Sequence, residues 1–329
     1  AVGSDSGRRA LEALRSGSAG FSGLVTEELE ALQADDSEGP GGEAGQDLGM
    51  DIGELNRRIA EVREGDRVES AADLLHLQVI HDFREQFQAP MIPPMPRDGR
   101  GSKPGEVKLS PLDPKKLATS DVYTKDTLEL LKDHIMSIIG EWSHLTREYP
   151  LQLASYQVSK VYALSCHFGY SLQRADSRFR LEKQLGAAPA SLMEYVSAFG
   201  PEEAQQVANV ASREASRVVD VQVSSLFGDV ERLEEELADA LGPSDPSEDV
   251  SALLERLRTA VAEGEVTSMS ISVFDLRRLA LEGAAFGLLL ARAEAKVQAV
   301  YDFTPSTKES PLVPLGQRRS MSGFSIFGA

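Results

Sequence analysis

A long amphipathic helix with a glycine near its middle constrains the fold of this chain more than any other feature. Between Tyr156 and Leu185, apolar or small residues recur every three or four positions, which is the spacing of one face of an α-helix. Gly169 lies inside this helix, where glycine costs roughly 1 kcal/mol relative to alanine. This cost indicates close packing, because a glycine lets a second helix approach its backbone. We therefore expect a helix crossing at Gly169.

A second segment repeats this pattern. Residues 286–297 match residues 168–179 in order and residue type at several positions, with identical spacing and with a glycine, Gly287, at the place of Gly169. We interpret the two segments as central helices related by an internal repeat. Gly169 and Gly287 are then the predicted structural crossing of the fold.

Charge and cysteine content limit the function and the compartment. The chain of 329 residues has 52 acidic and 34 basic residues, and its formal net charge is -18. This balance argues against general nucleic-acid binding, which needs attraction to phosphate. The single cysteine, Cys166, cannot form an internal disulfide, which suits a reducing compartment, and we expect it to pack in a core. The densest apolar run, 284–291, is too short for a transmembrane helix.

The composition divides the chain into three parts. We expect a helical arm with an acidic, glycine-rich linker at 1–50, a helical core at 51–305, and an extended tail at 306–329. Within the core, 90–118 is a proline-rich crossing segment that we interpret as a linker. Residues 229–265, with twelve acidic and three basic residues, form an acidic helical insertion, either a solvated outer face or a binding site for a basic partner.

Local signals predict where several elements begin and end. The helix from Ile52 is expected to end near Gly65, and Asp66 with Glu69 forms a capping box for the next helix. Ser120 is the expected cap of the helix at 128–139.

Further along the chain, we expect Pro150 to end a region and Pro201 to begin a helix that continues to Phe227. Residues 266–273 alternate as a half-buried strand does, and 106–109 is the expected pairing strand. The predicted fold is therefore mainly α, a multi-helix bundle around two long central helices with a small two-stranded β element.

The sequence carries no recognisable catalytic or metal-binding motif. No two of its five histidines have the i, i+4 spacing that lets one helix face hold a metal ion. It also lacks a phosphate-binding glycine loop, a serine nucleophile elbow and a recognisable cysteine–histidine pair. We expect no cofactor, no metal and no catalytic residues.

A basic helix side and an apolar chain end form the candidate interaction surface. The helix 156–185 carries five basic residues against two acidic ones, and the tail ends with several apolar residues. The residues that we select from these two segments are Arg174, Arg178, Arg180, Phe324 and Phe327.

Two alternative functions remain open. Arg174, Arg178, Arg213 and Glu214 could converge on a small anion, such as a phosphorylated metabolite, in an enzyme or a binding protein. The basic helix side and the terminal aromatic residues could instead attach the chain to an anionic membrane surface.

The chain resembles the plastid domain-of-unknown-function family 760 of plants and algae. The similarity extends over most of the chain from Leu11 to Phe303. The matching motifs are Leu55-Asn56-Arg57-Arg58-Ile59-Ala60-Glu61-Val62-Arg63, Val161-Tyr162-Ala163, Phe168-Gly169-Tyr170, Arg178-Phe179-Arg180-Leu181-Glu182-Lys183, Ser212-Arg213-Glu214-Ala215, Ser225-Leu226-Phe227-Gly228 and Leu276-Arg277-Arg278-Leu279-Ala280-Leu281-Glu282. The resemblance implies a plastid location and a helical fold, and it implies no catalytic residues.

Together, these observations predict a non-enzymatic protein of the chloroplast stroma, with peripheral thylakoid association as a variant. We expect it to bind a protein partner, in assembly or in stress-related regulation. The chain begins at Ala1 and lacks an apolar signal core, as expected of a mature form that has lost a targeting peptide.

Overall fold

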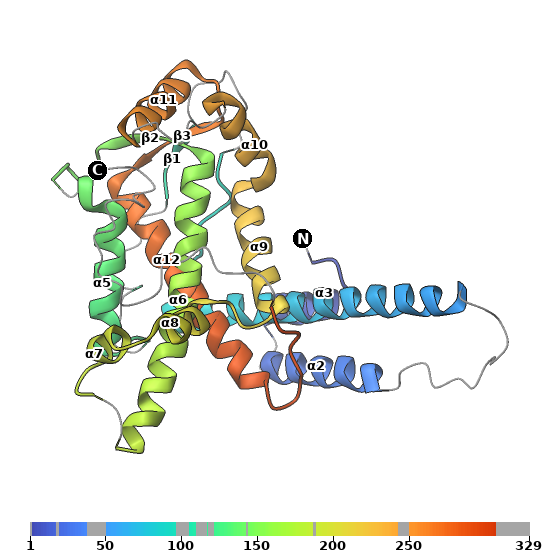
Figure 1. Ribbon diagram of the computed structural model, residues 1–329. Helices are drawn as coiled ribbons and strands as arrows, with labels where there is room; N and C mark the ends of the chain where they lie inside the picture. Colours follow the sequence, from blue (N-terminus) through green and yellow to red (C-terminus); the bar gives the residue numbers. More distant parts are fainter. Residues whose placement is uncertain are drawn as a thin grey trace. The chain divides into compact units, whose positions relative to one another are not determined.

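The computed structural model describes residues 2–17, 20–37, 51–96, 105–109, 117, 122–142, 144–186, 189–242 and 250–306. Within this part the fold is mainly α-helical with a small three-stranded sheet, as Figure 1 shows, so the predicted fold class is confirmed. The chain divides into two compact units. The first unit contains the described parts of Ala1–Asp82, Val210–Val218 and Leu289–Lys308, and the second contains those of Phe83–Asn209 and Val219–Leu288.

The elements follow one another in a fixed order along the chain. They are α1 (Asp5–Arg15), α2 (Phe21–Ser37), α3 (Asp51–Phe87), β1 (Gly105–Val107), α5 (Lys125–Ile139), η1 (Gly140–Trp142), β2 (Pro150–Ala154), α6 (Ser155–Gln184), α7 (Leu192–Ser197), α8 (Pro201–Ala208), α9 (Arg213–Phe227), α10 (Val230–Leu241), α11 (Val250–Glu263), β3 (Ser268–Ser272) and α12 (Val273–Val297).

The second unit is built on the crossing of α6 and α12, green and orange in Figure 1. A Cβ atom added at Gly169 would lie 2.7 Å from the carbonyl carbon of Ala284 on α12. One added at Gly287 would lie 2.6 Å from the carbonyl carbon of Cys166 and 2.9 Å from the amide nitrogen of Tyr170, both on α6. Each helix therefore presents a glycine to the backbone of the other, and the two main chains touch where side chains normally separate them.

The small sheet joins the beginnings of these two helices. The strand order is β1-β3-β2, with β1 parallel and β2 antiparallel to β3. α6 follows β2 directly, and α12 follows β3 directly. The backbone amides of Ser155 and Val273 continue the ladder by donating to the carbonyl oxygens of Thr267 and Tyr149, at 2.9 and 3.3 Å. The sheet thus fixes the start of each central helix.

One of the three strands differs from the expectation. The pairing of β1 with β3 confirms the predicted strand and its partner. The prediction of only two strands was wrong, because Pro150 begins β2 and does not simply end a region. Proline can occupy the first residue of a strand, where the ladder does not need its missing N–H.

Three helix boundaries also differ from the expectation. α3 continues through Gly65, so Asp66 and Glu69 lie in its interior and cap nothing. The cap of α5 is Thr124, whose hydroxyl accepts from the Thr127 amide at 3.2 Å, and Ser120 lies outside the described residues.

The helix expected from Pro201 to Phe227 is interrupted and forms α8 and α9. Ser212 immediately precedes α9 and caps its first turn, because its hydroxyl accepts from the Ala215 amide at 3.1 Å. The same hydroxyl donates to the Glu294 carboxylate at 2.5 Å, so the residue at this interruption also contacts a distant part of the chain.

The extended segment after α3 packs in the second unit. Of the predicted crossing segment 90–118, residues 90–96, 105–109 and 117 are described. Ile92 and Met95 are buried, and the Met95 amide donates to the Leu226 carbonyl oxygen at 2.7 Å. The Ile92 amide donates to the buried Glu282 carboxylate at 2.9 Å.

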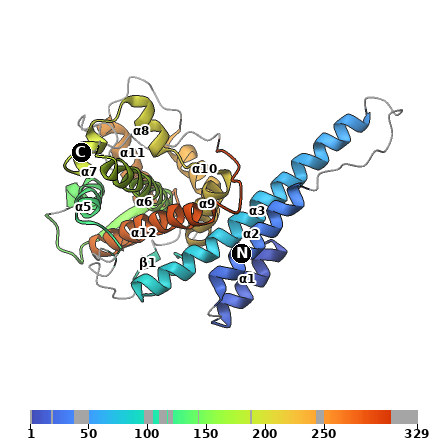
Figure 2. The ribbon, with the colours of Figure 1, turned by 90° about the horizontal axis from the view of Figure 1, so that it is seen from below.

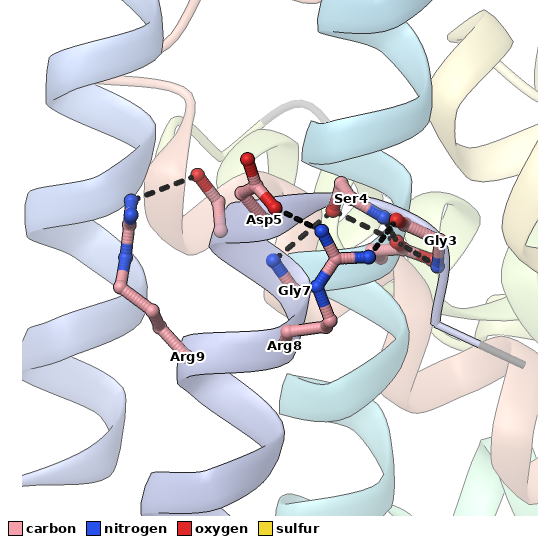
Figure 3. Close-up of polar contacts among 8 residues, drawn as sticks. Gly3, Ser4, Asp5, Gly7, Arg8 and Arg9 are labelled. Carbon is pink, nitrogen blue, oxygen red and sulfur yellow. Dashed lines mark hydrogen bonds and ion pairs between the residues drawn. The ribbon is translucent and has the colours of Figure 1, made fainter.

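The first unit holds the start of the chain against α3. The Asp73 carboxylate, which is buried on α3, accepts from the backbone amides of Gly3 and Ser4 and from the Ser4 hydroxyl, at 2.8 to 3.0 Å. Figure 3 shows the second role of Ser4, whose hydroxyl accepts from the Gly7 amide and so caps α1. The N-terminal helix is thus attached by a partly buried, charge-assisted network.

Candidate interaction surface

The predicted basic side of α6 is largely occupied by contacts within the protein. The Arg174 guanidinium donates to the carbonyl oxygens of Gln206 and Asn209, at 3.1 and 2.7 Å, and lies 5.7 Å from the centre of the Tyr170 ring. It therefore binds the carbonyl groups at the C-terminus of α8, which a cation stabilises.

The other two arginines of this side are paired with carboxylates. Arg180 contacts Asp176 at 2.6 Å, and Arg178 contacts Glu182 and Glu203 at 3.3 and 3.4 Å. Glu203 belongs to α8, so Arg178 also links α6 to that helix. These contacts neutralise much of the positive charge expected on the surface.

No contact among the described residues joins the four residues of the predicted anion site, which are Arg174, Arg178, Arg213 and Glu214. Arg213 contacts Glu64 at 2.6 Å. Glu214 is buried and accepts from the Thr304 amide and the Tyr301 hydroxyl, at 3.2 Å each. Both contacts lie inside the first unit, whereas Arg174 and Arg178 make theirs inside the second unit.

Phe324 and Phe327, the remaining residues of the predicted surface, lie outside the described residues.

A buried polar group next to the helix crossing is the clearest feature that the sequence did not indicate. Glu282 on α12 is fully buried, and burial raises the pKa of its carboxyl group to about 7, although the Ile92 amide and Arg278 oppose the shift. Burial also raises the pKa of the Cys166 thiol, as does the nearby Glu282 carboxylate. A protonated, buried thiol is a poor nucleophile, so Cys166 serves packing.

A serine–histidine pair also lies partly buried in the second unit. His134 Nε2 lies 3.1 Å from the Ser165 hydroxyl, and its ring stacks on Phe168 at 4.0 Å. Burial lowers the pKa of His134 to about 3, which makes it a weak base. Ser165 is fully buried, and its Cβ would lie 3.0 Å from a Cβ added at Gly283. The two atoms are therefore as close as a nucleophile and its general base, but the weak basicity of the histidine and the burial of the serine do not suit those roles.

The first turns of α3 carry an exposed apolar stripe. Leu55, Ile59 and Val62 follow one another at intervals of four and three, so they share one side of the helix, and they are 56%, 40% and 62% exposed. We call these three residues the α3 stripe. In Figures 1 and 2 the first turns of α3 extend past the end of α2.

The surroundings of the α3 stripe change abruptly along the helix. Residues 54–66 are all exposed, whereas 71–75 and 77–79 are all buried. The exposed turns are held by the i, i+4 ion pairs Arg57–Glu61 and Glu54–Arg58, at 2.7 and 3.6 Å, each of which contributes a few tenths of a kcal/mol. These turns extend a helix that is already nucleated by its buried part, and burial of their apolar side chains against a partner would stabilise them further.

Two other kinds of site are absent from the described residues. None of their helices is both long and apolar enough to cross a membrane. In the same part of the chain, no three histidine, cysteine or acidic side chains are placed to hold a metal ion.

Comparison with known proteins identifies a family of unknown function and one chloroplastic relative. Residues 54–185 match the model of a family described as a protein of unknown function (DUF760). The chain is also similar to a UV-B-induced chloroplastic protein of Arabidopsis thaliana, with 27% identity over 327 residues that cover 85% of this chain and 71% of the relative. No solved structure matches the chain significantly. These matches confirm the resemblance to family 760.

Proposed function

We propose that this chain, similar to DUF760 over residues 54–185, is a non-enzymatic protein of the plastid stroma that binds another protein through the α3 stripe. The chloroplastic relative supports the plastid location, and the words UV-B-induced in its name support a role in stress-related regulation or assembly.

The α3 stripe is the observation that carries this proposal. Three branched aliphatic side chains on one helix side lose the favourable free energy of burial when they stay in water, at roughly 25 cal/mol per Å². Scattered exposed apolar residues are ordinary, but a contiguous helical row of them is the pattern by which a helix binds a groove or another helix.

The contacts of the arginines support binding over catalysis. Arg174 serves the end of α8, Arg178 pairs with Glu182 and Glu203, and Arg213 pairs with Glu64. An anion would have to displace these protein partners, so the polar chemistry of these residues is accounted for by the fold.

The native mass of the protein tests the proposal. In plastid extract, we expect the wild-type chain to elute in a complex larger than its own 35.6 kDa. A variant with Leu55→Gln, Ile59→Gln and Val62→Gln should elute as the free chain, because glutamine keeps the helix propensity but removes the apolar contact.

The matched control is Arg57→Gln with Glu61→Gln, which removes an exposed ion pair from the same turns and spares the α3 stripe. It should elute like the wild type, and circular dichroism should show the same helix content for all three proteins. Equal elution of the wild type and the stripe variant would refute the proposed function.

A further inference from the structure

The residues beside the α3 stripe carry information about its partner. At 3.6 residues per turn, Arg58 and Arg63 lie on opposite flanks of the row formed by Leu55, Ile59 and Val62. Both arginines are exposed. In paired helices, residues in these flanking positions select the partner by charge.

The contact of Arg58 leaves it available to a partner. Its guanidinium lies 3.6 Å from the Glu54 carboxylate, and the two side chains are 71% and 57% exposed. An exposed ion pair at this separation contributes little to stability, so a better placed carboxylate of a partner can replace Glu54 as the partner of Arg58. A planar guanidinium is suited to a bidentate contact with such a carboxylate.

We propose that the α3 stripe binds an amphipathic helix of another protein whose apolar seam is flanked by acidic residues. This inference rests on the proposed function and names the chemistry of the partner. The row from Leu55 to Val62 spans about 10 Å at 1.5 Å per residue, so the partner contributes two to three turns. Three side chains bury much less than the roughly 800 Å² per partner of a standard interface, so flanking ion pairs must add to the specificity.

A second copy of the same helix fits this surface less well. In a parallel pair of two α3 helices, Arg58 of one copy would face Arg63 of the other, and like charges in these positions disfavour pairing.

An anionic lipid surface also fits less well. Helices that lie on membranes combine a broad apolar side, often with aromatic residues, with a basic polar side. The α3 stripe is narrow and aliphatic, and the remaining sides of these turns carry Glu54, Glu61 and Glu64.

Two peptides that share the same apolar residues but carry flanking charges of opposite sign test the inference with the full-length chain. Two synthetic helices share the same leucine seam and length, and their flanking positions carry either glutamate or lysine. By fluorescence anisotropy we expect the glutamate-flanked peptide to bind about tenfold more tightly at low salt, with a smaller ratio at high salt.

Charge reversal provides the matched comparison. Arg58→Glu with Arg63→Glu should transfer the preference to the lysine-flanked peptide, whereas Arg57→Glu, on the opposite side of the helix, should leave it unchanged. Anionic phosphatidylglycerol vesicles and the chain's own self-association are measured in parallel.

Several results would overturn the inference. These are equal binding of the two peptides, no binding of either, stripe-dependent binding to vesicles alone, or stripe-dependent dimerisation of the chain alone. None of these results decides the proposed function, which is tested separately by the native mass of the stripe variant. Failure of the inference and failure of the proposed function are therefore distinguishable.

Discussion

Gly287→Ala will destabilise the second unit by about 3 kcal/mol, the largest effect we expect from adding a single methyl group. The new Cβ would lie 2.6 Å from the carbonyl carbon of Cys166 and 2.9 Å from the Tyr170 amide nitrogen, both backbone atoms that cannot rotate away. α6 and α12 must then separate and lose contacts along their whole crossing. Urea unfolding followed by the fluorescence of Trp142, the single tryptophan of the chain and part of the second unit, measures the change.

Gly65→Ala is the control for this experiment. Gly65 lies in the interior of α3, and a Cβ added there meets no atom within 4 Å. Alanine should therefore favour that helix by about 0.5 to 1 kcal/mol, as is usual in a helix interior, and leave the Trp142 transition of the second unit unchanged. If Gly287→Ala unfolds at the wild-type urea concentration, the backbone contact between α6 and α12 is wrong.

Glu282→Gln will change the pH dependence of stability. Burial raises the pKa of the Glu282 carboxyl group from 4.5 to about 7 in the folded protein. Between these two values the folded chain retains a proton that the unfolded chain has released, so wild-type stability falls as pH rises through this window. At 1.36 kcal/mol per pKa unit, the loss amounts to about 3 kcal/mol.

The neutral glutamine variant lacks this loss while keeping an acceptor for the Ile92 amide. We expect the two proteins to be equally stable near pH 4.5 and the variant to be more stable above pH 7, by urea unfolding followed by Trp142 fluorescence. Glu61→Gln, an exposed change on α3, should follow the wild-type profile. Parallel profiles for the wild type and Glu282→Gln would show that this carboxyl group titrates normally in the folded chain.

The central helices could be predicted from the sequence because their signals are local. The apolar spacing and the interior glycine of α6 are visible within 30 residues, and α12 repeats them. The interruption between α8 and α9 could not be predicted, because residues 209–212 contain no glycine or proline. The contacts of Ser212 with Glu294 and Pro305, more than 80 residues away, accompany it, and no local pattern reveals them.

The surfaces were harder to predict than the helices for the same reason. Arg174 looked free because the α8 carbonyl groups that it binds lie 32 and 35 residues further along the chain, and Glu203, the second partner of Arg178, lies 25 residues further. The pairs Arg180–Asp176 and Arg178–Glu182 are local and could have been predicted from their i, i+4 spacing. Leu55, Ile59 and Val62 form an ordinary amphipathic pattern, and only the structure shows that nothing in the described residues covers them. Glu282 belongs to a motif shared with the family, but no local pattern predicts its burial, which results from the packing of α6 and the Ile92 segment around it.

Site-specific photo-crosslinking in intact plastids tests most directly whether the α3 stripe is a binding surface. A photoreactive residue is placed at Ile59, within the stripe, or at Arg57, on the opposite side of the same exposed turns. We predict a discrete crosslinked protein from position 59 that is absent from position 57. Crosslinks to lipid alone, none at all, or the same products from both positions would contradict the proposed function.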